Sequence, residues 1–81
     1  MSSIKGENTK QIEVNVKELN LSEREEFNDS ITTDMKFSDY VKLCRLATDF
    51  TDKQLNEFTD MDIIAIGNLC YTVVNKKKLT K

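Results

Sequence analysis

The chain has 81 residues, of which 38 % are hydrophobic and 32 % are charged, as expected for one soluble globular domain. Proline is absent and glycine occurs only at Gly6 and Gly67. This scarcity disfavours an all-β fold, which needs turn residues at short intervals. Histidine is also absent, so the chain has no imidazole general base and no histidine metal ligand.

The net charge of −2 is unevenly distributed along the chain. Positions 1–75 hold eight basic and fourteen acidic residues and therefore carry −6, whereas positions 76–81 hold four lysines. An acidic body with a basic tail is not typical of nucleic-acid-binding proteins, which spread lysine and arginine over one face. The opening "MSSIKGENTK" is too polar for a signal peptide, and the longest aliphatic run, residues 63–66, is too short to cross a bilayer. The sequence therefore predicts a soluble, cytoplasmic protein without a membrane partner.

The two cysteines, Cys44 and Cys70, are not joined by a CxxC spacing. We expect them to be small, buried, apolar side chains in a reducing compartment. The sequence leaves a disulfide between them open.

The first predicted element is a strand. The stretch "QIEVNVKEL" alternates apolar and polar side chains, with Ile12, Val14 and Val16 on one face. Such alternation is typical of a half-buried strand. No second strand of equal clarity follows it, so we expect it to pair with the same strand of another copy or with a strand of a different protein.

The next stretch, "LNLSEREEF", has the features of a helix start. Ser22 fits the N-cap position, and Glu25 three residues later completes a capping box. Negative charges in this first turn are favoured by the helix dipole. The helix is expected to end near residues 32–34. Its apolar stripe is narrow and consists of Phe27, Ile31 and Met35.

A stronger helix is predicted over "SDYVKLCRLATDF", beginning at Asp34 or Ser38. At 100° per residue its apolar side chains fall within an arc of about 160°, with charged side chains opposite. The predicted core face consists of Tyr40, Leu43, Cys44, Leu46, Ala47 and Phe50.

The stretch "FTDKQLNEFTDMDI" repeats the phrase Phe-Thr-Asp at an interval of eight residues. Thr51 fits an N-cap with Gln54 closing a capping box, and Thr59 fits a second N-cap with Asp62 at the equivalent position. Each cap stabilises a helix start by about 1 kcal/mol. The repeat therefore predicts two successive helix starts rather than a repeated binding motif.

The last of these helices, over residues 60–75, is apolar nearly all round, so it is expected to be central to the core or buried in a partner. A hairpin about Gly67-Asn68 is the alternative, because β-branched residues flank this pair. The predicted fold is mainly α (α+β), a small bundle of three to four helices with one N-terminal strand. Its predicted parts are a disordered N-terminus over 1–10, a single helical domain over 11–75 and a basic tail over 76–81.

Few residues have the arrangement of a catalytic or metal site. Asp60 and Asp62 form a DxD pair, but acidic residues are expected in a first helical turn in any case. The chain has no glycine-rich phosphate loop, and no base that would activate a serine or threonine. We therefore expect a protein that is not an enzyme, needs no metal or cofactor and acts by protein–protein contact. The candidate partner-binding residues on the last helix are Ile63, Ile66, Cys70 and Val73.

The stretch "IEVNVKELNLSEREEF", residues 12–27, resembles the opening of small bacteriophage tail assembly chaperones, in which a short strand precedes an acidic helix with a marked cap. The later "FSDYVKLCRLATDF" and the closing "LTK" are compatible with this resemblance. It implies a small, mostly helical, acidic protein of the host cytoplasm that can form homo-oligomers. Such a protein coats the tape-measure protein and shields its apolar helices during virion assembly. No motif fixes which residues contact this client.

An alternative function is that of a small acidic inhibitor or nucleic-acid mimic of phage origin. Such a protein would place acidic side chains in a basic groove of a host protein, and its affinity would fall steeply as ionic strength rises. The residues that would form this surface are Glu23, Glu25, Glu26, Asp49, Asp52, Asp60 and Asp62.

Overall fold

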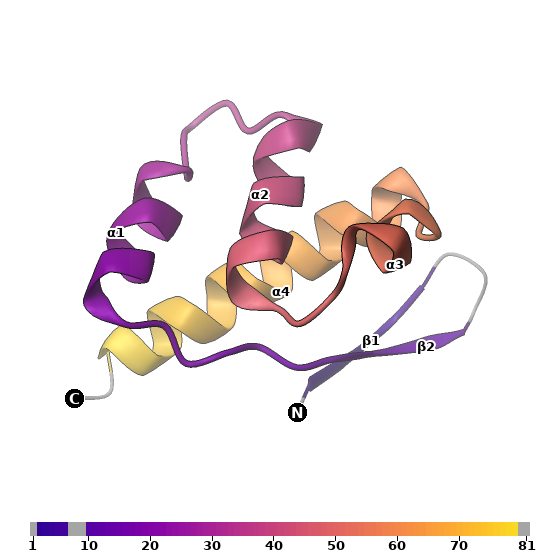
Figure 1. Cartoon of the computed structure of the whole chain (residues 1–81), viewed down its shortest axis with the longest axis horizontal. Helices are drawn as coiled ribbons and strands as arrows, with labels where there is room; N and C mark the ends of the chain where they lie inside the picture. The colour runs from indigo at the N-terminus through magenta and orange to yellow at the C-terminus, as the bar shows by residue number, and fades with distance from the viewer. Residues whose placement is uncertain (1, 7–9, 80–81) are drawn as a thin grey trace.

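A computed structural model of the chain describes residues 2–6 and 10–79, with side chains described over 3–6 and 10–75 (Figure 1). The described residues form two antiparallel strands followed by four helices. The predicted mainly α fold with a small β part is thereby confirmed. The lysine side chains of the predicted tail lie outside the described side chains, although the backbone of the last helix continues to Leu79.

The N-terminal strands form a hairpin, β1 (Ser2–Lys5) with β2 (Gln11–Val14), in which Ser2 lies opposite Val14. The prediction of disorder over residues 1–10 is therefore wrong for β1, while residues 1 and 7–9 lie outside the described part. The expectation of a partner strand in another molecule is also wrong, because β1 precedes β2 in the same chain. The strand β1 gave no clear pattern, because Ile4 is its single aliphatic residue.

Beyond β2 the chain stays extended and joins the helical part of the molecule. Val16 forms an isolated bridge with Thr48, and the Lys17 N–H donates to the Ala47 carbonyl at 2.7 Å. The hairpin is thus connected to the end of the second helix by backbone hydrogen bonds.

The first helix, α1 (Leu21–Asp29), begins two residues earlier than predicted. Asn20, not Ser22, is the N-cap, because the Glu23 N–H donates to Asn20 Oδ1 at 2.8 Å and the Asn20 N–H donates to Glu23 Oε1 at 3.1 Å. The helix also ends before the predicted 32–34. The residues that follow Ser30 are Ile-Thr-Thr, and β-branched side chains disfavour a further turn.

The second helix, α2 (Phe37–Ala47), has the predicted core face. Leu43, Cys44 and Ala47 are buried, while Tyr40 and Leu46 are half-buried. The helix begins between the two predicted positions, with the Lys36 N–H donating to Asp39 Oδ2 at 3.0 Å. Phe50 lies beyond the end of the helix.

Both predicted helix starts in the Phe-Thr-Asp repeat are confirmed, at α3 (Asp52–Asn56) and α4 (Asp60–Leu79). The Gln54 N–H donates to Thr51 Oγ1 at 3.2 Å, and the Asp62 N–H donates to Thr59 Oγ1 at 3.1 Å. The hairpin alternative is wrong, because α4 is one continuous helix. The two phenylalanines of the repeat also meet, with ring centroids 5.2 Å apart in an edge-to-face arrangement.

The core lies mainly between α2 and α4, and α2 crosses in front of α4 in the view of Figure 1. Val14 from β2, Phe27 from α1 and Leu55 from α3 complete it, so the hairpin and all four helices contribute to one core. The last helix is therefore central to the core of the single chain. The buried apolar side chains are Val14, Phe27, Leu43, Cys44, Ala47, Leu55, Ile63, Ile66, Cys70 and Val74.

Candidate functional site

Three of the four residues predicted to bind a partner lie in this core. Ile63 is 4 % exposed, Ile66 and Cys70 are fully buried, and Val73 is half-buried. A partner would reach the first three only if α4 moved away from α2. Their role in partner binding stays a prediction. In the folded chain, a partner would first contact other side chains, which lie on the surface.

The two cysteines are free thiols on the facing helices α2 and α4. Burial raises the pKa of Cys44 to about 11, against a weaker opposing effect of a backbone hydrogen bond. Burial also raises the pKa of Cys70 to about 12, and the neighbouring Cys44 adds to this shift. Thiols with such pKa values are protonated near neutral pH and are therefore poor nucleophiles.

The acidic residues do not gather on one surface. Glu23 and its neighbours lie on α1, at the opposite end of the molecule from α3, which begins at Asp52 (Figure 1). Asp60 is exposed whereas Asp62 is buried, so the DxD pair does not present two carboxylates to solvent together. Over the described ranges 2–6 and 10–79, no group of three or more Cys, Asp or Glu side chains is placed to hold a metal ion.

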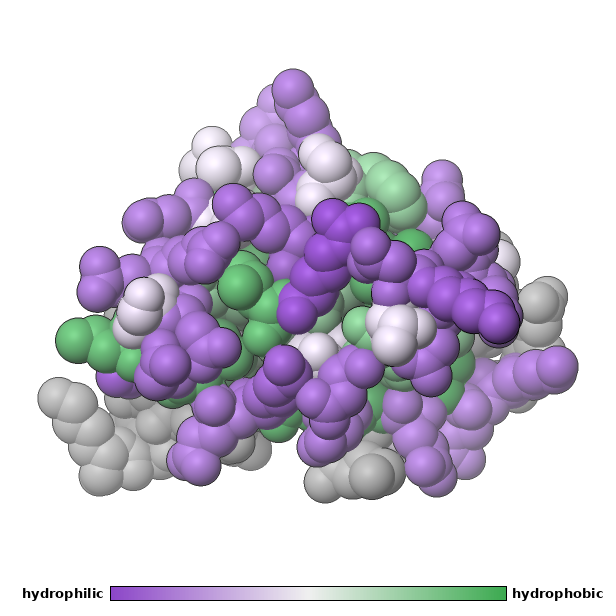
Figure 2. Space-filling model, viewed as in Figure 1, coloured by the Kyte–Doolittle hydropathy of each residue, from purple (hydrophilic) through white to green (hydrophobic). Residues whose placement is uncertain are grey.

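The face shown in Figure 2 is mostly hydrophilic, with hydrophobic residues visible in separate places. Among the side chains that the structure describes, most large apolar ones are at least half-buried, and the exposed ones are spread over the helices. They are Leu21, Phe37, Met61 and Tyr71.

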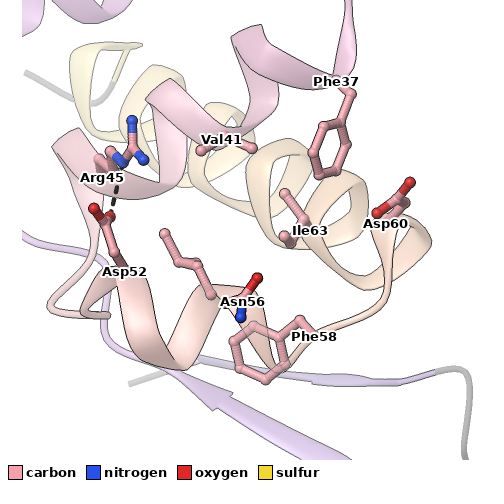
Figure 3. Close-up of a pocket in the computed structure, with 9 residues that line it drawn as sticks. Phe37, Val41, Arg45, Asp52, Asn56, Phe58, Asp60 and Ile63 are labelled. Carbon is pink, nitrogen blue, oxygen red and sulfur yellow. Dashed lines mark hydrogen bonds and ion pairs between the residues drawn. The ribbon is translucent and has the colours of Figure 1, made fainter.

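A hollow of about 260 Å³ lies between the first part of α2, the short helix α3 and the start of α4 (Figure 3). We call it the α3 groove. Side chains from all three helices point toward it, and Phe37, which is 41 % exposed, stands at its mouth. Its apolar lining is Phe37, Val41, Leu55, Phe58 and Ile63, and its polar lining is Arg45, Asp52, Asn56 and Asp60.

Polar groups mark the two ends of the α3 groove. At one end Arg45 Nε lies 2.9 Å from Asp52 Oδ1, an ion pair that joins α2 to α3 (Figure 3). Both side chains are more than half exposed, so the pair contributes under about 1 kcal/mol to stability. At the other end lies the exposed carboxylate of Asp60. The groove is therefore apolar inside and polar at its rim.

The sequence contained part of the signal for this groove. Phe37 and Val41 are four residues apart and lie outside the predicted core face of α2. Such a pair forms a second apolar face on one helix. The position of α3 opposite this face depends on the tertiary fold, so sequence reasoning missed the groove.

A second hollow, of about 240 Å³, lies on another side of α2 and includes Tyr40, Tyr71 and the loop that follows α1. Tyr71 is 44 % exposed at this place. The hollow is lined by Ile31, Thr32, Met35, Tyr40, Leu43, Asn68 and Tyr71.

Comparisons with protein families, with curated proteins and with solved structures found no match to this chain. Among the described helices, none combines the length and the apolar character that a membrane span requires.

Proposed function

We propose that this chain is a non-enzymatic binding protein and that the α3 groove holds an apolar anchor of a protein partner. The observation that carries the proposal is the convergence of apolar side chains from three helices on an open hollow, with Phe37 exposed at its mouth. At about 260 Å³ the hollow lies just below the usual range of small-molecule pockets, about 300–1,000 Å³. A side chain or two from a partner helix suits this volume better than a cofactor does.

The partner would bind as a helix in a groove, with apolar residues spaced three or four apart along one face. The more specific proposal is a phage tail assembly chaperone that shields apolar helices of the tape-measure protein. The resemblance of residues 12–27 supports this client. Such a protein acts in the cytoplasm, that of the host cell if the chain is viral.

The test is an NMR titration of the ¹⁵N-labelled chain with an uncharged amphipathic peptide of leucine, alanine and glutamine, about 18 residues long so that it can form a helix. We expect the amide signals of Val41, Leu55 and Ile63 to shift. Because binding buries apolar surface, raising the salt concentration should not weaken it.

A matched pair of variants tests the position of the site. Phe37→Ser should weaken peptide binding about tenfold, because it removes a large apolar side chain from the mouth of the groove. Leu21→Ser removes an apolar side chain that is 65 % exposed on α1, and should leave the affinity unchanged. Equal affinities of Phe37→Ser and the unaltered chain, or peptide-induced shifts confined to residues outside the groove, would contradict the proposal.

A further inference from the structure

One segment of the chain itself has the composition that the α3 groove would accept. Residues 76–81 read KKKLTK, a leucine flanked by lysines. The groove is apolar inside, and its polar rim includes carboxylates at both ends. Apolar and charge complementarity therefore point to the same segment.

The charges near the groove support this pairing. Asp49 is left out, because it lies 3.8 Å from Lys17 and pairs with it. The charged residues that line the groove, Arg45, Asp52 and Asp60, carry −1, against +4 for residues 76–81.

The segment cannot reach the groove of its own chain. The helix α4 starts at the groove with Asp60 and runs to Leu79, a rise of about 28 Å at about 1.5 Å per residue. Figure 1 shows the last turns of α4 at the opposite end of the molecule from α3. Leu79 belongs to this helix, which therefore holds it far from the groove of its own chain. A second copy must supply the segment.

We propose that residues 76–81 of one copy bind in the α3 groove of a second copy, with Leu79 as the apolar anchor and the lysines near Asp52 and Asp60. This inference rests on the proposed function, because it fills the same groove and names a second copy of the chain as one occupant. An apolar client and this segment then compete for the groove.

The contact joins two different surfaces, so each bound copy keeps one unused groove or one unused tail. Such head-to-tail contacts generate open chains, or rings where the rotation closes. Because lysines and carboxylates meet at the exposed rim, the contact is weakened by salt. Mass should therefore rise with concentration at low salt and fall when salt is added.

The test is analytical ultracentrifugation of the full chain and of two complementary variants. The tail variant ends after Asn75, with Leu79→Asp in the full-length chain as a second form, and the groove variant is Phe37→Ser. The unaltered chain should form species larger than dimers, and each variant alone should be monomeric. An equimolar mixture of the two variants should form a heterodimer and grow no further, because one copy offers only a groove and the other only a tail.

A further variant tests the alternative that the lysines bind to the acidic helix α1 instead of the groove. Glu25→Gln with Glu26→Gln should leave the assembly unchanged. The inference is overturned if the unaltered chain stays monomeric, if the tail variant assembles like the unaltered chain, if the mixture stays monomeric, or if the α1 variant abolishes assembly. In each of these cases the proposed function still stands if Phe37→Ser weakens binding of the uncharged peptide, so the two failures are distinguishable.

Discussion

Gly67 of α4 packs against Tyr40 of α2. A Cβ added at this position would lie 2.8 Å from Tyr40 Cδ1 and 3.3 Å from Tyr40 Cβ. Alanine is favoured over glycine inside a helix by about 1 kcal/mol, but overpacking a core costs about 1–3 kcal/mol. We expect Gly67→Ala to lower the free energy of unfolding by about 1 kcal/mol, as measured by urea denaturation followed by circular dichroism.

The control for this prediction is the same substitution in a Tyr40→Ala background. With the ring removed, the crowding disappears and the helix preference of alanine remains, so Gly67→Ala should then stabilise the chain. A stabilising effect of Gly67→Ala in the unaltered chain would mean that the close approach does not constrain this position.

The buried thiols of Cys44 and Cys70 make stability depend on alkaline pH. Burial raises their pKa values from 9.0 to about 11 and about 12, so the folded state holds these protons more tightly than the unfolded state. This contribution is complete below pH 9 and is lost as the pH rises through the folded-state values. We expect the free energy of unfolding to fall between pH 9 and pH 12.

The comparison is with the Cys44→Ala/Cys70→Ala chain, in which lysines and tyrosines still titrate. Its free energy of unfolding is expected to be lower at pH 8, because two core side chains are truncated. It should then decline less steeply above pH 9 in urea denaturation. Parallel pH profiles for the two chains would show that the thiols do not contribute.

At the scale of elements, the start of α1 can be tested by two neighbouring substitutions. Asn20 caps the helix through Oδ1, whereas Ser22 lies inside the first turn. We expect Asn20→Ala to lower the free energy of unfolding by about 1 kcal/mol. Ser22→Ala should change it by less than about half of that, because alanine is a better helix former and no cap is lost. If Ser22→Ala lowered the free energy of unfolding more than Asn20→Ala does, the N-cap would be Ser22.

The helix starts show what local sequence rules decide. At Thr51 and Thr59 a single residue fits the N-cap, and each Phe-Thr-Asp phrase predicted its helix correctly. Before α1 the same pattern occurs twice, at Asn20 with Glu23 and at Ser22 with Glu25, so local rules fit both. The helix starts at the earlier of the two caps, and its nine residues include the two that this earlier start adds.

Other elements depend on contacts that no local rule contains. The strand β1 is short and mostly polar, and its pairing with β2 gives it a regular conformation. The α3 groove needs α3 to lie across from Phe37 and Val41, which the sequence of α2 alone does not state. The core face of α2 was predictable, because its apolar spacing follows the helical period.

At the scale of the whole molecule, the hairpin and the helices differ in how firmly they are held. The core between α2 and α4 contains most of the fully buried side chains, whereas β2 contributes Val14, and Ile4 and Ile12 are only half-buried. Segments with few buried apolar side chains open locally at low free energy. The hairpin should therefore open without unfolding of the helices.

Native-state hydrogen exchange measures this difference directly. The Gly6 N–H donates to the Lys10 carbonyl at 2.8 Å, and we expect it to exchange at least about tenfold faster than the amides of Leu43 and Ile66 in the helical core. The Lys17 N–H is the internal control, because it donates to the Ala47 carbonyl at the end of α2 and should be protected more strongly than that of Gly6. If the hairpin amides were as protected as those of Ile66, the strands and helices would open as one unit, and the hairpin would belong to the cooperative core rather than lying against it.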